Sequence, residues 1–152
     1  MQNLTIEKAE LNDLPKIMEI YAYAREFMKK TGNPNQWSDK FPEEAVLRND
    51  IQAGNLYVIK ENGAIHAVFA LIIGEDPTYA HIEQGAWHSD ATYGTIHRVA
   101  GDGKLHGIFA LVTEFCSRKI SHLRVDTHRD NQVMQHLILR NGFEECGVIY
   151  VA

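Results

Sequence analysis

The sequence holds few cysteines, and their placement indicates neither a cross-link nor a metal site. Cys116 and Cys146 are the only two among 152 residues, and they lie far apart without the paired spacing of metal ligands. The eight histidines include no H-x3-H pair on a predicted helix with a third ligand nearby. We therefore expect two reduced, partly buried thiols rather than a disulfide, and no bound metal.

Other features are missing too, and each absence excludes a class of protein. The net charge is −5, which opposes nonspecific binding of nucleic acid. No basic tract suggests a membrane surface, no apolar run approaches the length of a membrane-spanning helix, and the start MQNLTIEKAE lacks a signal-peptide pattern. No repeat or linker divides the chain. We expect a single cytoplasmic domain over residues 1–152, with no nucleic-acid or membrane partner.

The most informative stretch runs from residue 95 to residue 131. Its pattern predicts a buried strand at 95–100, a loop with three glycines in seven residues at 101–107, and then a helix. Glycine lets a ligand approach the backbone closely, and the first N–H groups of a helix lack partners, so the helix start near Gly107 suits a diphosphate. Lys104 and His106 would add positive charge. A glycine-rich connection without a ligand is an equally weighted alternative, and the spacing matches neither a Rossmann fingerprint nor a P-loop.

Hydrophobic periodicity and turn residues divide the chain into strands and helices. Strands are expected at 4–9, 55–60, 64–73, 95–100, 121–126 and 143–151. Helices are expected at 12–31, 42–53, 108–118 and 127–142. Pro15 falls in the first turn of the first helix, and a capping box at Thr127 opens the last one. Asn62-Gly63 predicts a hairpin turn, and the continuous apolar run 64–73 predicts a central strand.

Two stretches carry a resemblance to a known family. Lys104-Leu105-His106-Gly107-Ile108-Phe109 follows the form Q/R-x-x-G-x-G/A between a strand and a helix, and Arg140-Asn141-Gly142-Phe143 ends the next helix. With IHRVA, VDTHRDN and NGFEECGVIYV, they resemble a bacterial branch of the GNAT superfamily of N-acetyltransferases over nearly the whole chain. Three positions depart from the family pattern. Lys104 replaces Gln or Arg, Phe109 replaces Gly or Ala, and Ile138 replaces a Tyr that protonates the leaving thiolate in many members.

The resemblance implies an α/β (α+β) fold. Its expected form is a mixed, mostly antiparallel sheet of about six strands, flanked by about four helices, with two central strands that splay apart. The last strand of the family is missing, so we expect an exposed sheet edge or a partner subunit that completes the sheet, and hence a possible homodimer.

The resemblance also implies acetyl-CoA as the cosubstrate, held at the splay. A backbone N–H of Val99 or Ala100 would polarise the thioester carbonyl, and the amides from His106 to Ala110 would hold the diphosphate. The expected cofactor-binding residues are Arg98, Val99, Ala100, Lys104, Leu105, His106, Gly107, Ile108, Phe109, Ala110 and Asn131. Asn131 has helix capping as its alternative role.

An amine must lose a proton before it attacks a thioester, so the chemistry needs a base. The candidates are Glu83, His97 and His128, and a structural role is the alternative for each histidine. Tyr150, His136 or solvent are the candidates to replace the Tyr that is absent at Ile138, whereas Cys116 is not expected to act as a nucleophile. Substrate-binding aromatics are expected among Trp37, Tyr79 and Trp87, with packing on the domain surface as the alternative.

Three functions remain open at this point. The first is an N-acetyltransferase acting on a small-molecule or peptide amine. The second is a non-catalytic acyl-CoA-binding or regulatory module on the same fold. The third is a structural α/β domain without a cofactor, because a fold alone does not determine a function.

Overall fold

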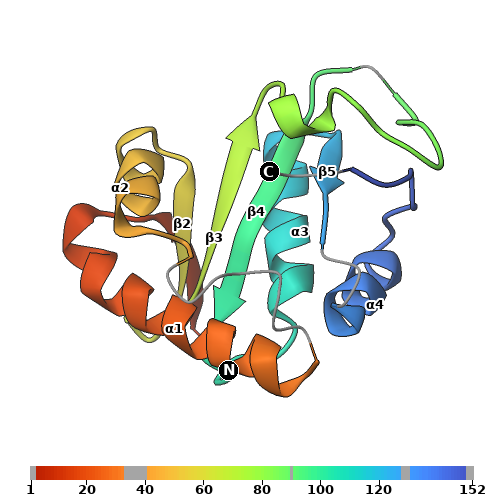
Figure 1. The fold of residues 1–152 in the computed structure, drawn as a ribbon. Coiled ribbons are helices and arrows are strands. Elements are labelled where there is room, and N and C mark those ends of the chain that lie inside the picture. The colour runs from red at the N-terminus through yellow and green to blue at the C-terminus, as the bar shows by residue number, and fades with distance from the viewer. Residues whose placement is uncertain (1–2, 33–40, 90, 128–130, 150–152) are drawn as a thin grey trace.

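The computed structural model describes residues 3–32, 41–89, 91–127 and 131–149. Their centre is a five-stranded sheet in the order β1-β2-β3-β4-β5 (Figure 1). The strands are β1 (Leu4–Lys8), β2 (Leu56–Glu61), β3 (Ala64–Ile73), β4 (Gly94–Gly101) and β5 (Leu123–Val125). The helices are α1 (Leu14–Lys30), α2 (Glu44–Gln52), α3 (Ile108–Lys119) and α4 (Gln132–Arg140), with 3-10 turns η1 (Leu11–Asp13) and η2 (Pro77–Tyr79). The first four strands pair antiparallel, and β5 pairs parallel with β4.

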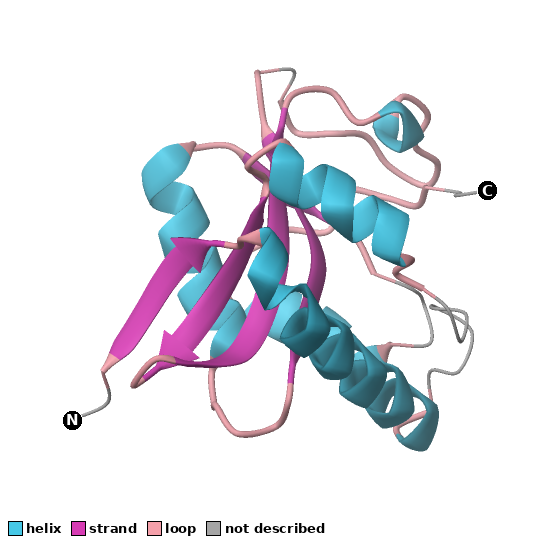
Figure 2. Cartoon of the chain, turned by 90° about the vertical axis from the view of Figure 1, so that its left-hand side faces the viewer, coloured by secondary structure: helices cyan, strands magenta, loops and turns pink. Residues whose placement is uncertain are grey.

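The sheet separates two hydrophobic clusters because successive side chains of a strand point to opposite faces. On β2, Leu56 and Val58 join the cluster formed with α1 and α2, whereas Tyr57 and Ile59 join the cluster formed with α3. Figure 2 shows the sheet between the two layers of helices. β3 lies in the middle of the strand order, which confirms the central position predicted for the run 64–73.

Local signals placed several elements correctly. Asn62 and Gly63 both have positive φ, 51° and 86°, as a two-residue hairpin turn between β2 and β3 requires. α1 has Pro15 in its first turn, where a missing N–H costs no helical hydrogen bond. α3 begins at Ile108 as predicted and ends one residue later, at Lys119.

Two predictions for the last third of the chain are wrong. The segment from Phe143 to Ile149 forms no strand, and Val148 makes only an isolated antiparallel bridge with Glu83. Gly142 and Gly147 have φ of +92° and +154°, positive values that a regular strand does not contain. The last helix begins at Gln132 rather than at Thr127, with Asn131 as its N-cap. The sheet described here thus has five strands, where about six were expected.

The sheet is forked between β4 and β5, as the resemblance implied. Their ladder covers three pairs of residues and ends at Ile96 opposite Val125. β4 continues to Gly101 without a partner on that side among the described residues, and its other edge stays paired with β3. The fork therefore begins at His97 on β4 and at Asp126 after β5.

A β-bulge lies on β4 immediately beyond the start of the fork. Val68 of β3 faces Ala100 and Ala70 faces His97, so Phe69 is opposite two residues, Arg98 and Val99. Arg98 has φ of 52°, a left-handed conformation that is uncommon for a side chain of its size. A bulge redirects the backbone groups that follow it, and bulges are frequent beside functional sites.

Candidate functional site

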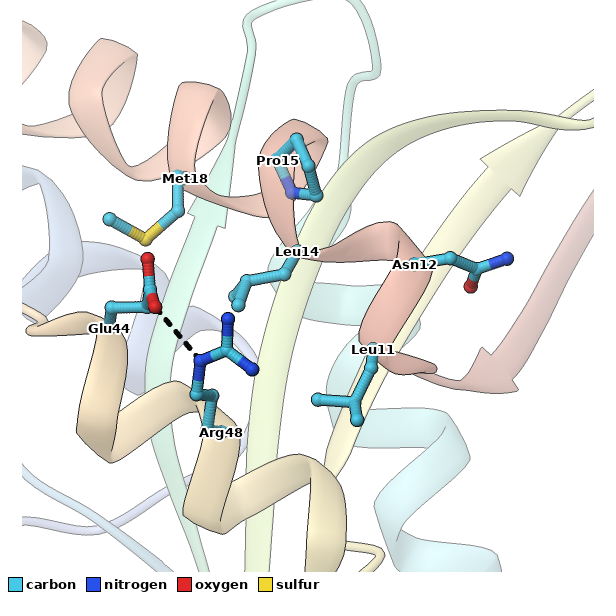
Figure 3. Close-up of a pocket in the computed structure, with 7 residues that line it drawn as sticks. All are labelled: Leu11, Asn12, Leu14, Pro15, Met18, Glu44 and Arg48. Carbon is cyan, nitrogen blue, oxygen red and sulfur yellow. Dashed lines mark hydrogen bonds and ion pairs between the residues drawn. The ribbon is translucent and has the colours of Figure 1, made fainter.

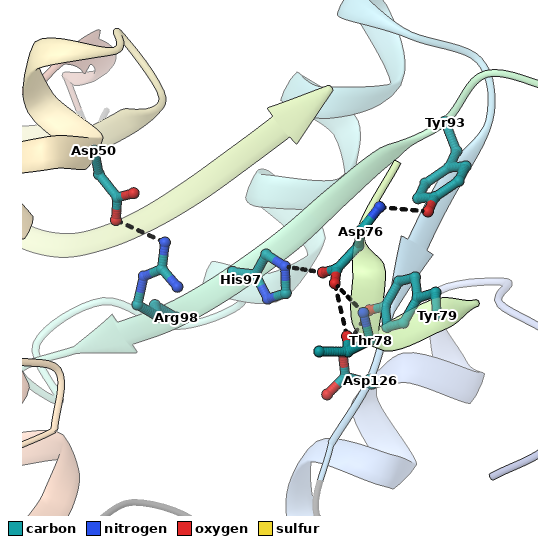
Figure 4. A network of polar contacts seen from close by, with 8 residues as sticks. All are labelled: Asp50, Asp76, Thr78, Tyr79, Tyr93, His97, Arg98 and Asp126. Atoms are coloured by element: carbon teal, nitrogen blue, oxygen red, sulfur yellow. Dashed lines mark hydrogen bonds and ion pairs between the residues drawn. The ribbon is translucent and has the colours of Figure 1, made fainter. Parts of the chain in front are cut away.

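A histidine and an aspartate meet where the sheet divides. His97 Nε2 lies 3.0 Å from Asp76 Oδ2, and the two side chains are 23% and 16% exposed (Figure 4). Asp76 caps the short turn η2, where its Oδ1 accepts hydrogen bonds from the N–H and the hydroxyl of Thr78. Burial alone would raise the pKa of Asp76, but the hydrogen bonds from Thr78 and His97 hold it below its usual value. Asp76 is therefore a carboxylate at neutral pH.

Tyr79 and Trp87, predicted to bind substrate, lie in an aromatic cluster beside this pair. Tyr79 is buried, its hydroxyl donates to Asp126, and its ring centroid is 4.9 Å from that of Trp87. The guanidinium carbon of Arg124 lies 4.1 Å from the Trp87 centroid and 3.8 Å from that of Tyr93. Burial and the Asp126 carboxylate raise the pKa of Tyr79 far above its usual value. These contacts hold Tyr79, Trp87 and Tyr93 against β5 and the residue that follows it, Asp126.

Arg98 extends to a different partner from its neighbour His97. Its guanidinium donates to Asp50 of α2 at 2.6 Å, and the two side chains are 14% and 11% exposed (Figure 4). The backbone carbonyl of Arg98 accepts a hydrogen bond of 2.7 Å from the hydroxyl of Tyr21, a buried residue of α1. Burial raises the pKa of Tyr21, so its hydroxyl stays protonated and can donate. The backbone and the side chain of Arg98 are thereby both held by the layer of α1 and α2.

The glycine-rich loop ends at the start of α3. Gly107 is the N-cap of α3 with φ of 68°, and no atom lies within 4 Å of the place where a Cβ would stand. The helix start is therefore open to a ligand. At the other end of the loop, Asp102 accepts the N–H of Lys104 at 3.0 Å and contacts His66 Nδ1 at 2.8 Å.

Two residues of the predicted cofactor loop place their side chains in the core. Leu105 is 6% exposed and Phe109 is 3% exposed, and the Phe109 ring packs beside that of Phe143. Only their backbone groups are then available to a ligand, which explains how an apolar side chain is accommodated where the family has Gly or Ala. The side chains of Lys104 and His106 are exposed.

The remaining predicted residues are dispersed. Glu83, a predicted candidate base, is half exposed and pairs with the exposed His81 at 3.1 Å. Asn131 Oδ1 accepts a hydrogen bond from the N–H of Met134, so Asn131 has the helix-capping role that was the alternative to cofactor binding. Trp37, His128 and Tyr150 lie outside the described residues.

Sequence reasoning missed Asp76, Asp50 and Tyr21. For Asp76 a signal was present, because Asp-Pro-Thr has a capping residue followed by a proline at the first turn position. The partners of Tyr21 and Asp50 lie 77 and 48 residues away in the chain, and no local pattern reports such contacts.

Two hollows lie elsewhere on the molecule. The larger, about 430 Å³, lies between the start of α1 and α2 and is lined by Leu11, Asn12, Leu14, Pro15, Met18, Glu44 and Arg48 (Figure 3). The smaller, about 190 Å³, lies between β1, β2 and α3. Neither is lined by a residue of the fork. Within the described ranges, no group of three or more His, Cys, Asp or Glu side chains could hold a metal ion, and no helix is long and apolar enough to cross a membrane.

The two cysteines are free thiols and differ in their surroundings. Cys116 is buried in the α3 cluster, and burial raises its pKa to about 12 against the opposing charge of Lys119. Because the thiolate is the reactive form, we expect a disulfide reagent at about pH 8 to titrate one thiol, Cys146, in the native protein and both in denaturant. Rapid titration of two thiols in the native protein would contradict the burial of Cys116.

No family model and no curated protein matches the sequence. A GNAT-family acetyltransferase from Streptococcus agalactiae is 29% identical, with a TM-score of 0.87 over 96% of this chain and 88% of that chain. A GNAT-family acetyltransferase from Listeria monocytogenes is 18% identical, with a TM-score of 0.73 over 95% and 88%. An aminoglycoside N-acetyltransferase in complex with CoA is 14% identical, with a TM-score of 0.65 over 100% and 95%.

The forked sheet and its flanking helices define a class of mixed α/β domain that these solved structures share. That class is the GNAT fold, and the resemblance of the sequence to GNAT N-acetyltransferases is thereby confirmed. The assignment to a branch through IHRVA, VDTHRDN and NGFEECGVIYV stays a prediction.

Proposed function

We propose that this protein is an N-acetyltransferase that transfers the acetyl group of acetyl-CoA to a primary amine by direct attack. The observation that carries the proposal is the fork. There the bulged strand β4 has no partner on its β5 side among the described residues, and a His–Asp pair and a glycine-capped helix start belong to the same stretch of chain and sheet. A neighbour with the same fold holds CoA, which supports the same cosubstrate here. The acceptor class stays broad, a small-molecule or peptide amine.

Two parts of the backbone are suited to the cosubstrate. The side of β4 beyond Ile96 that is not paired with β5 can bind an extended pantetheine arm in the way that a sheet edge binds an added strand. The open helix start at Gly107 offers N–H groups and the positive end of a helix dipole to the diphosphate. The cosubstrate supplies an acetyl thioester, whose sulfur is a moderately good leaving group.

The bulge favours Val99 over Ala100 as the oxyanion donor in this proposal. Val99 follows the left-handed residue Arg98, so its N–H is the one that the bulge redirects. Ala100 is back in register with Val68. We therefore assign the polarisation of the thioester carbonyl to the N–H of Val99, held in place by Tyr21 and Asp50 through Arg98.

His97 is the base in this proposal. It stands at the start of the fork and remains partly exposed, so an ammonium group can give it a proton before the free amine attacks. Glu83 and His128 remain the alternatives. Tyr79 and Trp87 then frame the acceptor side by holding the segment 74–93, and Trp37 stays a predicted contact. A cytoplasmic location and a homodimer also stay predictions.

Thermal denaturation with acetyl-CoA, with NADH and ATP as controls, tests the first half of the proposal. A ligand that binds only the folded state raises the melting temperature by mass action. We expect a rise with acetyl-CoA alone, followed by thiol release on a panel of amines. No shift at millimolar acetyl-CoA would overturn the proposal.

A matched pair of variants at Gly107 tests the diphosphate site. Asn and Asp both tolerate the left-handed conformation at this position, and both have room there. Gly107→Asp adds a negative charge beside the diphosphate, so we expect its affinity for acetyl-CoA to fall at least about tenfold below that of Gly107→Asn. Titration calorimetry measures both, and equal affinities would place the diphosphate elsewhere.

The alternative is a non-catalytic acyl-CoA-binding module. It is favoured by Ile138, a half-buried apolar residue on α4 where many family members have an acid Tyr. It predicts the same thermal shift but no thiol release with any amine. Turnover therefore separates the two functions.

A further inference from the structure

We propose that Asp76 is a positioning residue that holds the His97 imidazole in the tautomer with its hydrogen on Nε2, so that Nδ1 carries the lone pair that takes the proton from the amine. The proposal rests on the proposed function, in which His97 is the base. It assigns a role to a residue outside the site predicted from the sequence, and it names the atom of His97 that takes the proton.

The position of Asp76 is determined by contacts on three sides. Its N–H donates to the hydroxyl of Tyr93 at 2.7 Å, and its Oδ1 accepts the N–H of Thr78 at 2.9 Å and the Thr78 hydroxyl at 2.7 Å. These bonds leave Oδ2 directed at His97 Nε2, 3.0 Å away (Figure 4). A carboxylate accepts hydrogen bonds and cannot donate them, so the ring nitrogen that faces it carries the hydrogen.

The same contacts determine how the amide of Asp76→Asn is oriented, and therefore which tautomer His97 adopts in that variant. The Thr78 N–H can only donate, so the asparagine oxygen must occupy the place of Oδ1. The asparagine NH₂ then faces His97 and can only donate. The ring must accept this hydrogen bond at Nε2 and move its own hydrogen to Nδ1. The nitrogen that takes the proton in the wild-type protein then has no lone pair.

The test combines a spectroscopic signature with kinetics. ¹⁵N NMR of histidine-labelled full-length protein, at about pH 8.5 where imidazole is neutral, reports which ring nitrogen bears hydrogen. His97→Gln assigns the signals. We expect Nε2–H in the wild type and Nδ1–H in Asp76→Asn. We also expect kcat to fall about 100-fold while KM for acetyl-CoA and amine stays within about twofold.

A surface pair provides the matched control. His88 Nδ1 lies 3.1 Å from Glu144, and both side chains are more than half exposed. Glu144→Gln makes the same chemical change in an exposed His–carboxylate pair that does not contact His97 or Asp76, so kcat and the His97 signals should stay at wild-type values. Far-UV circular dichroism shows whether Asp76→Asn is folded. The ¹⁵N NMR spectrum of the wild type tests the tautomer even if the variant does not fold.

Each outcome decides a separate point. Hydrogen on Nδ1 of His97 in the wild type would overturn the proposal, and so would an unchanged His97 tautomer in folded Asp76→Asn. If the His97 tautomer changes in Asp76→Asn but kcat does not, Asp76 has no positioning role in catalysis. If the wild type releases no thiol with any amine of the panel, the proposed function falls. The two NMR spectra still support or refute the orientation of His97 by Asp76.

Discussion

Replacing His97 by glutamine is expected to lower kcat by about 100-fold or more and to leave KM for acetyl-CoA nearly unchanged. Glutamine can still donate a hydrogen bond to Asp76, so the segment 74–79 keeps its anchor. It cannot take a proton near neutral pH, so the amine loses its base. Initial rates of thiol release at saturating acetyl-CoA measure the effect.

Parallel variants decide between the candidate bases. Glu83→Gln and His128→Gln are measured under the same conditions, and His88→Gln serves as a control because His88 is an exposed residue paired with Glu144. Loss of kcat only in His97→Gln supports the assignment. A wild-type kcat in His97→Gln, with loss in one of the other two, would move the base to that residue and remove the proposed role of Asp76.

Replacing Asp50 by alanine is expected to lower the free energy of unfolding by about 3–5 kcal/mol, because it leaves a buried guanidinium without its carboxylate. The Arg98 side chain is only 14% exposed, and within the described residues its Nε has no hydrogen-bond partner even in the wild type. Because Arg98 also forms the bulge, we expect kcat to fall together with stability. Urea denaturation followed by circular dichroism measures the change.

An exposed ion pair calibrates this effect. Arg48 and Glu44 are 2.8 Å apart on α2, with side chains 50% and 55% exposed. Glu44→Ala should cost no more than about 1 kcal/mol, because water solvates both groups and screens their attraction. If Asp50→Ala lowers the free energy of unfolding as little as Glu44→Ala does, the Arg98 guanidinium is hydrated and the bulge does not depend on Asp50.

Elements with strong local signals could be predicted from the sequence. The Asn62-Gly63 turn, the proline in the first turn of α1 and the start of α3 depend on the conformational preferences of a few consecutive residues. The central position of β3 follows from its apolar run, since only a strand covered on both faces can bury such a run. The strand predicted from Phe143 does not form over 143–149, because apolar residues after a helix-ending glycine permit a strand but do not provide a partner for it.

Sequence pattern was enough to give the order of the elements from β1 to α4, the glycine-capped start of α3 and, through its motifs, the resemblance to the GNAT superfamily. Which side chains meet at the fork depends on packing between distant parts of the chain. His97 and Asp76 are 21 residues apart, Arg98 and Asp50 are 48 apart, and Tyr21 and Arg98 are 77 apart. The physical reason is that helix caps and turns depend on neighbours in the chain. The burial of a charge, the direction of a ring nitrogen and the strain of a bulge depend on groups that only packing brings together.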